Sequence, residues 1–261
     1  MKAKKSFGQN WLRDNYTLDK IVDSADIDTK DTVLEVGPGL GTLTHKLVET
    51  EASIVAVEAD RDLIPGLQKR FINSNNLHLE YGDILKFNLQ SLPSRYKVVA
   101  NIPYYLTSHL LRNFLESDSP PSLMVLLVQK EVAERILAKP GKMSVLAFSV
   151  QYYARPEYIM DVKKELFEPV PKVDSAVIKI VMNQAPIFEA DKQKLFRLVK
   201  AGFGEKRKML RNSLSGGLHI DHVQAEELLR KAQIDLTSRA QELSLLDWQR
   251  LYSEAESGDL I

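Results

Sequence analysis

Short apolar runs rich in β-branched residues recur along the first half of the chain. They lie at residues 32–36, 53–57, 77–81, 97–100 and 123–128. Runs of this kind are typical of strands buried on both faces of a sheet. Between them, apolar residues fall at helical spacing in residues 42–49, 62–71 and 108–115. This alternation predicts an α/β fold with a mostly parallel sheet.

The pattern changes after Lys142. Residues 144–153 have helical spacing. Residues 157–162 and 173–181 have the pattern of two further strands, and the loop between them contains two prolines. Such a pair predicts an antiparallel hairpin at the edge of the sheet.

Only helical spacing follows Pro186. It is found in residues 192–201, 223–232 and 243–252. We therefore expect two domains of unequal size, because a single core stops growing at roughly 250 residues. The first is an α/β domain at residues 1–185, and the second is a small all-α domain at residues 186–261.

The composition is that of a globular protein. Of the 261 residues, 44% are hydrophobic and 27% are charged, which is ordinary for this class. The chain contains no cysteine, which excludes a disulfide scaffold, a thiolate nucleophile and a cysteine metal site and fits a cytoplasmic location. The first ten residues are basic and polar, and no long apolar run follows them. We therefore expect no signal peptide and no membrane anchor, and a mature chain that begins at Met1.

Positive charge is local rather than overall. Lys and Arg total 35, as do Asp and Glu, so the net charge gives no argument for a polyanionic partner. Cations gather in two places, first at Lys2, Lys4, Lys5 and Arg13, and then at Lys206, Arg207, Lys208 and Arg211. A neutral protein can present a local basic face to nucleic acid in this way.

A glycine-rich turn follows the first predicted strand, in the sequence Glu35-Val-Gly37-Pro-Gly39-Leu-Gly41. Glycine at this point lets the chain turn tightly into a helix and lets a ligand approach the backbone. The spacing matches neither the dinucleotide fingerprint nor a phosphate-binding loop, which disfavours a pyrophosphate ligand. Glu35, just before the turn, suits a cationic ligand. The alternative is that the glycines only make a tight connection.

Acidic residues close the next two strands as well. Glu58 lies about 20 residues past the glycines, where a carboxylate in Rossmann-like folds accepts both ribose hydroxyls. Asp83 follows the third strand and is placed to accept from an adenine amino group. Either can instead be a solvated carboxylate, but three acids at successive strand ends line the edge where open α/β sheets bind ligands. With the glycine turn, they resemble the S-adenosylmethionine site of class I (Rossmann-like) methyltransferases.

The segment Asn101-Ile102-Pro103-Tyr104 follows the fourth strand. It resembles the tetrad of methyltransferases that modify amino groups of nucleic acids. An exocyclic adenine nitrogen is a poor nucleophile because its lone pair is delocalised into the ring. Oxygens of the Asn101 side chain and the Ile102 backbone can accept its two hydrogens and turn the lone pair toward the methyl donor.

The other two tetrad residues have supporting roles. Pro103 stiffens the turn, and the Tyr104 ring stacks on the base. The alternative is an ordinary strand-ending turn with Tyr104 in the core. We expect the next residue, Tyr105, to pack in the core.

Most of the chain is similar to the KsgA family of ribosomal RNA small subunit (16S rRNA) adenine dimethyltransferases. The segments that carry the similarity are residues 7–12, 129–135, 167–176, 203–214 and 239–244. The most specific of them is residues 167–176, Phe-Glu-Pro-Val-Pro-Lys-Val-Asp-Ser-Ala. Trp11, Gln241 and the pair Ser108-His109 depart from the family pattern but remove no group that the reaction needs.

The resemblance implies a reaction and a substrate. Methyl groups would pass from S-adenosylmethionine to the exocyclic N6 of two adjacent adenines in the 3′-terminal hairpin of 16S rRNA. The substrate would be a partly assembled 30S subunit, and the enzyme would be a cytoplasmic monomer that needs no metal and no membrane.

The resemblance also implies roles for residues. The cofactor would be bound by Asn10, Leu12, Glu35, Gly37, Gly39, Gly41, Glu58, Asp83 and Asn101. Phe167 would close over the target base opposite Tyr104, the alternative being a hydrophobic cap on the sheet edge. RNA would be bound by Lys172 and by a basic helix that carries Lys206, Arg207, Lys208 and Arg211. An isolated basic cluster is more often a solvated face.

Two other functions remain open. An Erm-type methyltransferase that acts on 23S rRNA would share the fold, although residues 167–176 and the basic cluster argue against it. A non-catalytic RNA-binding, transcription or ribosome-assembly factor of this fold would not need an intact glycine turn and tetrad. The five histidines form no metal-binding pattern, and no Gly-x-Ser-x-Gly motif is present. We therefore expect neither a metal nor a covalent intermediate.

Overall fold

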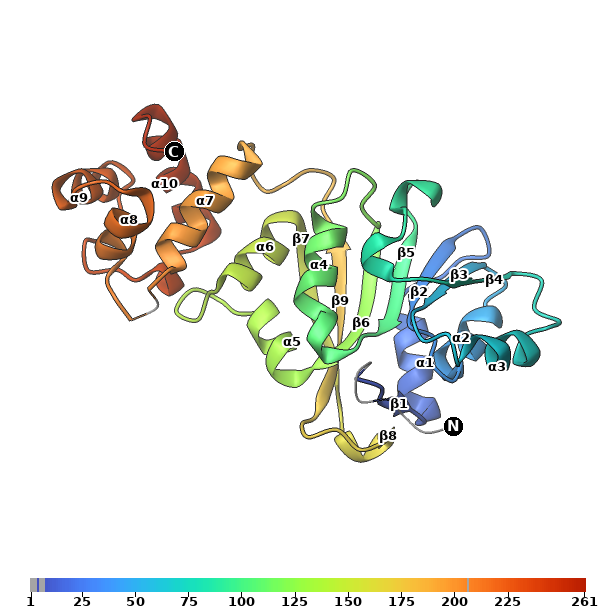
Figure 1. Ribbon diagram of the computed structural model, residues 1–261. Coiled ribbons are helices and arrows are strands. Elements are labelled where there is room, and N and C mark those ends of the chain that lie inside the picture. Colours follow the sequence, from blue (N-terminus) through green and yellow to red (C-terminus); the bar gives the residue numbers. More distant parts are fainter. Residues whose placement is uncertain (1–3, 5–7, 206) are drawn as a thin grey trace. The chain divides into compact units, whose positions relative to one another are not determined.

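The computed structural model describes Lys4, residues 8–205 and residues 207–261. The described residues divide into two compact units (Figure 1). The first unit is Met1–Glu134 with Arg155–Met182, and the second is Arg135–Ala154 with Asn183–Ile261. Each unit has its own hydrophobic core.

A sheet forms the centre of the first unit, with the strand order β4, β3, β2, β5, β6, β9, β7 (Figure 1). The strands are β2 (Thr32–Val36), β3 (Ser53–Glu58), β4 (Leu77–Tyr81), β5 (Lys97–Asn101), β6 (Leu123–Gln129), β7 (Ala154–Val162) and β9 (Ser175–Met182). Pairing is parallel from β4 through β6, and β9 is antiparallel to β6. The predicted mostly parallel sheet is confirmed, and its antiparallel part lies toward one edge, as the sequence indicates.

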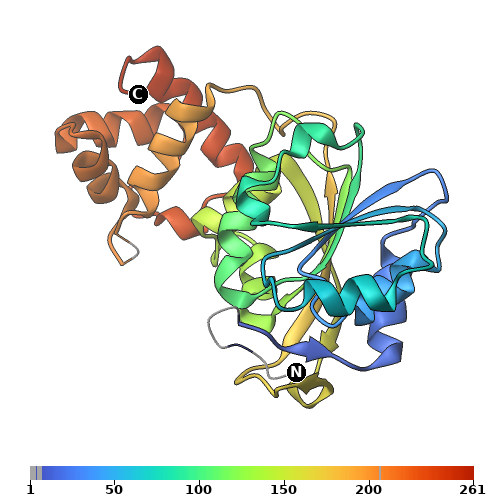
Figure 2. The same cartoon turned by 45° about the vertical axis from the view of Figure 1, so that its right-hand side comes forward.

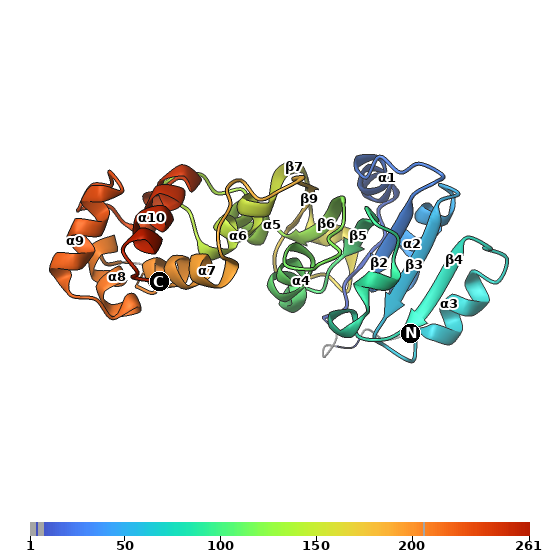
Figure 3. The same cartoon turned by 90° about the horizontal axis from the view of Figure 1, so that it is seen from above.

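Helices cover both faces of this sheet, which explains why its central strands β2, β5 and β6 are mostly apolar and buried. The α-helices are α1 (Asn15–Ser24), α2 (Thr42–Val48), α3 (Ile64–Arg70), α4 (Thr107–Leu115) and α5 (Lys130–Ile136), the last of which runs into the second unit. Residues of α1 and α2 pack on the face that carries Val33, and Figure 3 shows α1 and α4 on opposite sides of the sheet. No helix within the described ranges has the length and apolar character needed to cross a membrane.

A short antiparallel pair joins two segments that are far apart in the sequence. β1 (Trp11–Leu12) pairs with β8 (Phe167–Glu168), and the two segments lie near each other in Figure 2. Trp11 lies opposite Glu168, and Leu12 lies opposite Phe167. The Arg13 amide donates to the Leu166 carbonyl at 3.1 Å, which extends the pairing. Strands of two residues have no measurable period, so the sequence did not predict this contact.

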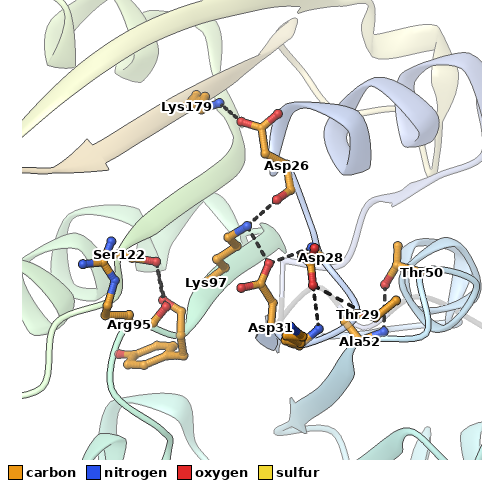
Figure 4. Close-up of polar contacts among 12 residues, drawn as sticks. Asp26, Asp28, Thr29, Asp31, Thr50, Ala52, Arg95, Lys97, Ser122 and Lys179 are labelled. Atoms are coloured by element: carbon orange, nitrogen blue, oxygen red, sulfur yellow. Dashed lines mark hydrogen bonds and ion pairs between the residues drawn. The ribbon is translucent and has the colours of Figure 1, made fainter.

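A polar cluster ties the loop between α1 and β2 to the amino ends of the strands (Figure 4). Lys97 of β5 binds Asp31 Oδ2 at 2.7 Å and also the Asp26 carbonyl. Lys179 Nζ of β9 lies 2.5 Å from Asp26 Oδ2. These contacts brace the edge of the sheet opposite the carboxyl ends of the parallel strands.

The second unit is made of helices around Trp248, whose side chain is fully buried. The helices are α6 (Val145–Tyr153), α7 (Lys192–Phe203), α8 (Leu210–Leu218), α9 (His222–Lys231) and α10 (Leu245–Ser257). α8 lies so close to α7 that a Cβ at Gly217 would be 2.6 Å from the Cβ of Ala201. Packing therefore requires glycine at position 217.

The division between the units differs from the expected boundary between residues 185 and 186. Residues 135–154 belong with the C-terminal helices, because Phe148 and Tyr152 of α6 pack in the core around Trp248. The chain consequently passes between the units three times. That one part binds the cofactor and the other binds RNA remains a prediction.

Candidate active site

The glycine turn lies between β2 and α2 and uses glycine for two reasons. Gly37, Gly39 and Gly41 have φ angles of 67°, 61° and 79°, in the left-handed region where side chains are disfavoured. A Cβ at Gly37 would meet no atom of the described residues within 4 Å, so this residue faces open space among them, whereas a Cβ at Gly41 would lie 2.6 Å from the Phe71 ring. Gly37 therefore leaves room for a ligand, and Gly41 allows α2 and α3 to pack.

A cavity of about 420 Å³ opens next to this turn, at the carboxyl ends of the parallel strands. This is the edge where open α/β sheets bind ligands. The predicted site residues that line it are Asn10, Gly37, Gly39, Glu58, Asp83, Asn101, Ile102, Pro103 and Tyr104. Residues from the N-terminal segment and from four strand ends thus share one cavity.

Glu58 closes β3 and is 5% exposed. Its Oε2 accepts from the Gly39 amide at 3.0 Å and its Oε1 from the Asp60 amide at 2.7 Å. Burial raises the pKa of Glu58, and the two amides act against that rise by stabilising the carboxylate. The side chain is thus fixed at the wall of the cavity, where its oxygens can accept from two neighbouring hydroxyl groups.

Asp83 follows β4 and begins a short 3₁₀ helix, Ile84–Lys86. Its Oδ1 accepts from the Leu85 amide at 3.0 Å, which holds the carboxylate at the end of the helix. The side chain lies at an exposed part of the cavity wall and can accept a hydrogen bond from a ligand there.

Glu35 does not line the cavity. It is 1% exposed in β2, behind the glycine turn, and its Oε2 has no hydrogen-bond partner among the described residues. Burial, helped by the nearby Glu58 carboxylate and opposed by Thr44, raises the pKa of Glu35 to about 8. Glu35 therefore lies beneath the glycine turn, where its side chain can support the turn but does not face the cavity.

Asn101 ends β5, and its orientation is defined by the N-terminal segment. Its Nδ2 donates to the Asn10 carbonyl at 3.1 Å. An amide that donates through Nδ2 keeps its Oδ1 as the acceptor for a further partner. The next residue, Ile102, buries its side chain and donates its amide to the Leu127 carbonyl at 3.2 Å, which anchors the turn to β6.

Tyr104 is half-buried and begins a 3₁₀ turn, Tyr104–Leu106. Its hydroxyl forms a 2.8 Å hydrogen bond with Ser175 Oγ of β9. Burial raises the pKa of Tyr104, with Ser175 acting in the opposite direction. The hydrogen bond fixes the ring at the cavity rather than in the apolar core.

Leu12 and Phe167 lie in the core of the first unit and do not line the cavity. They are 1% and 3% exposed and sit opposite each other in the β1–β8 pair. The buried side chain of Phe167 packs as the alternative of a hydrophobic cap on the sheet edge predicts. For Phe167 to close over a base, this packing would have to change.

Several lining residues were not predicted, among them Gln9, Trp11 and Tyr105. Gln9 and Trp11 come from the N-terminal segment, and Trp11 Nε1 is buried without a hydrogen-bond partner in the described part of the chain. Tyr105 is 62% exposed at the cavity, so the expectation that it packs in the core is wrong. Tyr105 lies in the 3₁₀ turn Tyr104–Leu106, which leaves its ring exposed.

The predicted RNA-binding residues are distributed over both units. Lys172 is exposed in the loop between β8 and β9. Arg207 and Lys208 are exposed between α7 and α8 rather than on a helix, and Arg211 lies on α8. Lys208 binds Glu205 at 2.6 Å and Arg211 binds Glu226 at 2.7 Å. Lys206 lies outside the described residues. The expected single basic helix is thus a loop followed by a helix.

The strand order and the ligand cavity at its carboxyl edge place the protein among the S-adenosylmethionine-dependent methyltransferases of Rossmann-like fold. The turn after β5 carries the Asn-Ile-Pro-Tyr sequence that resembles the tetrad of methyltransferases acting on amino groups of nucleic acids. A family model described as ribosomal RNA adenine dimethylase matches residues 1–256, and the chain belongs to this family. The resemblance seen in the sequence is confirmed.

Individual relatives support the same assignment. The ribosomal RNA small subunit methyltransferase A of Dehalococcoides mccartyi is 43% identical over 97% of this chain and 89% of that protein. The protein of the same name from Rippkaea orientalis is 44% identical over 94% of each chain.

Solved structures agree on the fold. A dimethyladenosine transferase from Plasmodium falciparum is 26% identical, with a TM-score of 0.84 over 95% of this chain and 98% of that chain. The 23S rRNA methyltransferase ErmE is 25% identical, with a TM-score of 0.77 over 95% of this chain and 100% of that chain. The fold is thus shared with a 23S rRNA methyltransferase, so the fold alone does not define the RNA substrate.

Proposed function

We propose that the protein transfers methyl groups from S-adenosylmethionine to the exocyclic N6 of two adjacent adenines in the 3′-terminal hairpin of 16S rRNA. The reaction would give dimethyladenosines during small-subunit biogenesis in the cytoplasm. The observation that carries the proposal is the Asn101 amide, oriented at the edge of an acidic cavity in a chain of the ribosomal RNA adenine dimethylase family.

The cavity fits S-adenosylmethionine by the chemistry of its wall. Glu58 and Asp83 offer acceptors for the hydroxyl and amino donors of an adenosine group, and Gly37 leaves open space beside the backbone. Trp11 Nε1, which has no hydrogen-bond partner among the residues that the structure describes, offers a donor at the same wall. When bound, the cofactor supplies a methyl group on a positively charged sulfur. The expectation that no metal takes part remains a prediction.

Asn101 and Ile102 are the residues that we propose act on the substrate nitrogen. Asn101 Oδ1 and the Ile102 carbonyl accept the two N6 hydrogens, which turns the nitrogen lone pair out of conjugation and toward the methyl donor. No strong base is required, because the proton leaves after the nitrogen has become cationic. Much of the rate then comes from positioning.

Tyr104 provides the surface for an adenine that has left its helix. Stacking on an aromatic side chain is worth about 1 to 3 kcal/mol per base, and extrusion costs a few kcal/mol. Because Ser175 already holds the Tyr104 hydroxyl, the ring needs no ordering when the base enters. The stacking energy therefore offsets much of the cost of extrusion.

RNA outside the cavity would be bound by cations of both units. Lys172, Arg207, Lys208 and Arg211 are the described candidates, with Lys206 added from the sequence. Lys208 and Arg211 already bind acidic residues, so contact with phosphate would require them to exchange partners. We further propose that the substrate is a partly assembled 30S subunit and that the enzyme acts as a monomer.

The test is transfer of labelled methyl groups from S-adenosylmethionine to unmethylated small subunits and, separately, to large-subunit RNA. Wild type and Asn101→Ala are compared. Label on adenines of small-subunit RNA that is absent with Asn101→Ala supports the proposal. Label on large-subunit RNA favours an Erm-type activity, and binding of the cofactor without any transfer favours an assembly factor.

A further inference from the structure

A buried acidic residue lies beside the cavity without lining it. Asp60 follows β3 and is 3% exposed. Its Oδ1 accepts from Lys4 Nζ at 2.6 Å, and its Oδ2 accepts from Gln9 Nε2 at 2.8 Å. The Asp62 amide donates to the same carboxylate at 3.1 Å. Gln9 closes the arrangement, because its Oε1 accepts from the Lys4 amide at 2.7 Å.

These contacts explain how a carboxylate is kept charged at a buried position. Burial alone would raise the pKa of Asp60, but the donors from Lys4, Gln9 and Asp62 lower it below its ordinary value. The pKa of Lys4 is raised in turn, because the Asp60 and Asp62 carboxylates stabilise its charged form. The N-terminal segment is thus attached to the end of β3 by an ion pair and a charge-assisted hydrogen bond.

Asp60 also contacts the cavity wall through its backbone. Its amide donates to Glu58 Oε1 at 2.7 Å, and the other oxygen of Glu58 accepts from Gly39. The residue that holds Gln9 therefore also sets the position of the acid at the end of β3.

Gln9 is linked to the tetrad through the backbone of its neighbour Asn10. The next residue, Asn10, accepts from Asn101 Nδ2 through its carbonyl oxygen at 3.1 Å. A displacement of Gln9 moves this carbonyl, and Asn101 then loses the contact that selects its Oδ1 as the acceptor for substrate. The chain of contacts runs from Asp60 through Gln9 and Asn10 to Asn101.

We propose that Asp60 and Gln9 are positioning residues that hold residues 8–12 against the cavity and thereby set the orientation of Asn101. Their hydrogen bond couples the wall of the cofactor site to the group that binds the substrate nitrogen. The effect on methyl transfer rests on the proposed function, whereas the effect on the cavity wall does not.

The donor and the acceptor of the hydrogen bond between Gln9 and Asp60 can be exchanged by mutation, and this exchange provides the test. Gln9→Glu places two carboxylates against each other, and Asp60→Asn places two amide donors in competition for acceptors. The double variant Asp60→Asn with Gln9→Glu restores one donor and one acceptor with opposite polarity. Asp62→Asn is the matched control, because Asp62 also binds Lys4 and loses the same charge but does not contact Gln9.

Three measurements follow each variant: the Kd for S-adenosylmethionine, quenching of tryptophan fluorescence by acrylamide, and the kcat and KM for RNA methylation. Of the two tryptophans, Trp248 is fully buried, so a change in quenching reports on Trp11. We expect each single variant to raise the Kd for the cofactor about tenfold, which corresponds to the loss of one buried hydrogen bond. We also expect each single variant to increase the quenching of tryptophan fluorescence. We expect kcat to fall more than the KM for RNA rises.

The double variant is expected to recover to within about threefold of wild type, and Asp62→Asn is expected to match wild type. Additive losses in the double variant, or equal losses in Asp62→Asn, would overturn the proposal. If wild type transfers no methyl group to rRNA, the proposed function fails. The Kd and quenching data still decide the role of Asp60 and Gln9 in that case.

Discussion

At the scale of single residues, Tyr105 shows how a neighbour of the tetrad can serve the substrate. Its exposed ring at the cavity is available to a base next to the extruded one. We expect Tyr105→Ala to raise the KM for RNA about fivefold or more, while Tyr105→Phe has little effect, because stacking needs only the ring. Tyr16 is the matched control, since it is also 62% exposed but does not line the cavity. A similar rise in KM for Tyr16→Ala would contradict this role.

Glu35 makes stability depend on pH. Burial raises its pKa from an ordinary 4.5 to about 8. Between these values the folded protein keeps the carboxyl protonated and the unfolded chain releases the proton, so stability falls as pH rises through this range. We expect the urea midpoint of wild type to decrease as the pH is raised from about 5 to about 8, and we expect a smaller decrease in Glu35→Gln. Equal falls would show that Glu35 does not titrate in this way.

The cavity residues Glu58, Asp83 and Asn101 could be predicted because they lie at or just after the ends of parallel strands, which meet at one edge of the sheet. Gln9 could not be predicted, because the place of residues 8–12 depends on contacts with distant segments, among them β8, which no local spacing encodes. Leu12 and Phe167, whose place in the motifs suggests contact with the cofactor or the base, have side chains that pack in the core, and their roles stay predictions.

At the scale of elements, the first five strands of the sheet were predicted closely, and three α-helices, α1, α5 and α8, were not predicted from apolar spacing. Each of the first five apolar runs coincides with a strand to within one residue at either end, because β-branched runs between turns leave little choice. α1 was missed. α8 was not recognised from apolar spacing because it contains Gly216 and Gly217, which disfavour a helix in isolation. Packing against α7 outweighs that preference.

The two glycines of α8 differ in a way that can be measured. A Cβ at Gly217 would collide with Ala201, whereas one at Gly216 would meet no atom within 4 Å. We expect Gly217→Ala to lower the free energy of unfolding by about 1 to 3 kcal/mol. Gly216→Ala should raise it by about 0.5 to 1 kcal/mol. Urea denaturation of both variants tests the prediction, and the same sign of change in both would refute it.

At the scale of the whole molecule, the two units are not consecutive pieces of the chain. A fragment of residues 1–185 keeps α6 but loses most of the core that Phe148 and Tyr152 belong to. We expect this fragment to expose these rings, to bind a hydrophobic dye and to aggregate more readily than the full chain. A fragment that unfolds cooperatively without binding the dye would support the boundary expected from the sequence instead.

Binding of RNA by a protein with no net charge should depend on a few local cations. We expect affinity to fall steeply with salt, and Arg207→Ala to reduce the slope of log K against log salt concentration by about 0.7 to 0.9, the value for one phosphate contact. Lys30→Ala is the control, because Lys30 is an exposed cation in the loop before β2. Titrations at several salt concentrations give the slope for each variant. A smaller slope for Lys30→Ala but not for Arg207→Ala would show that RNA binds near Lys30 and not near Arg207.

The pairing of β1 with β8 has a consequence for synthesis on the ribosome. Residues 11 and 12 leave the exit tunnel roughly 155 residues before the strand that they pair with. Until then the pairing that fixes β1 is absent, although Gln9 and Asn10 can already bind Asp60 and Asn101. A long loop has to close before β1 and β8 pair. We therefore expect the wall of the cavity to be completed only after translation has passed β8.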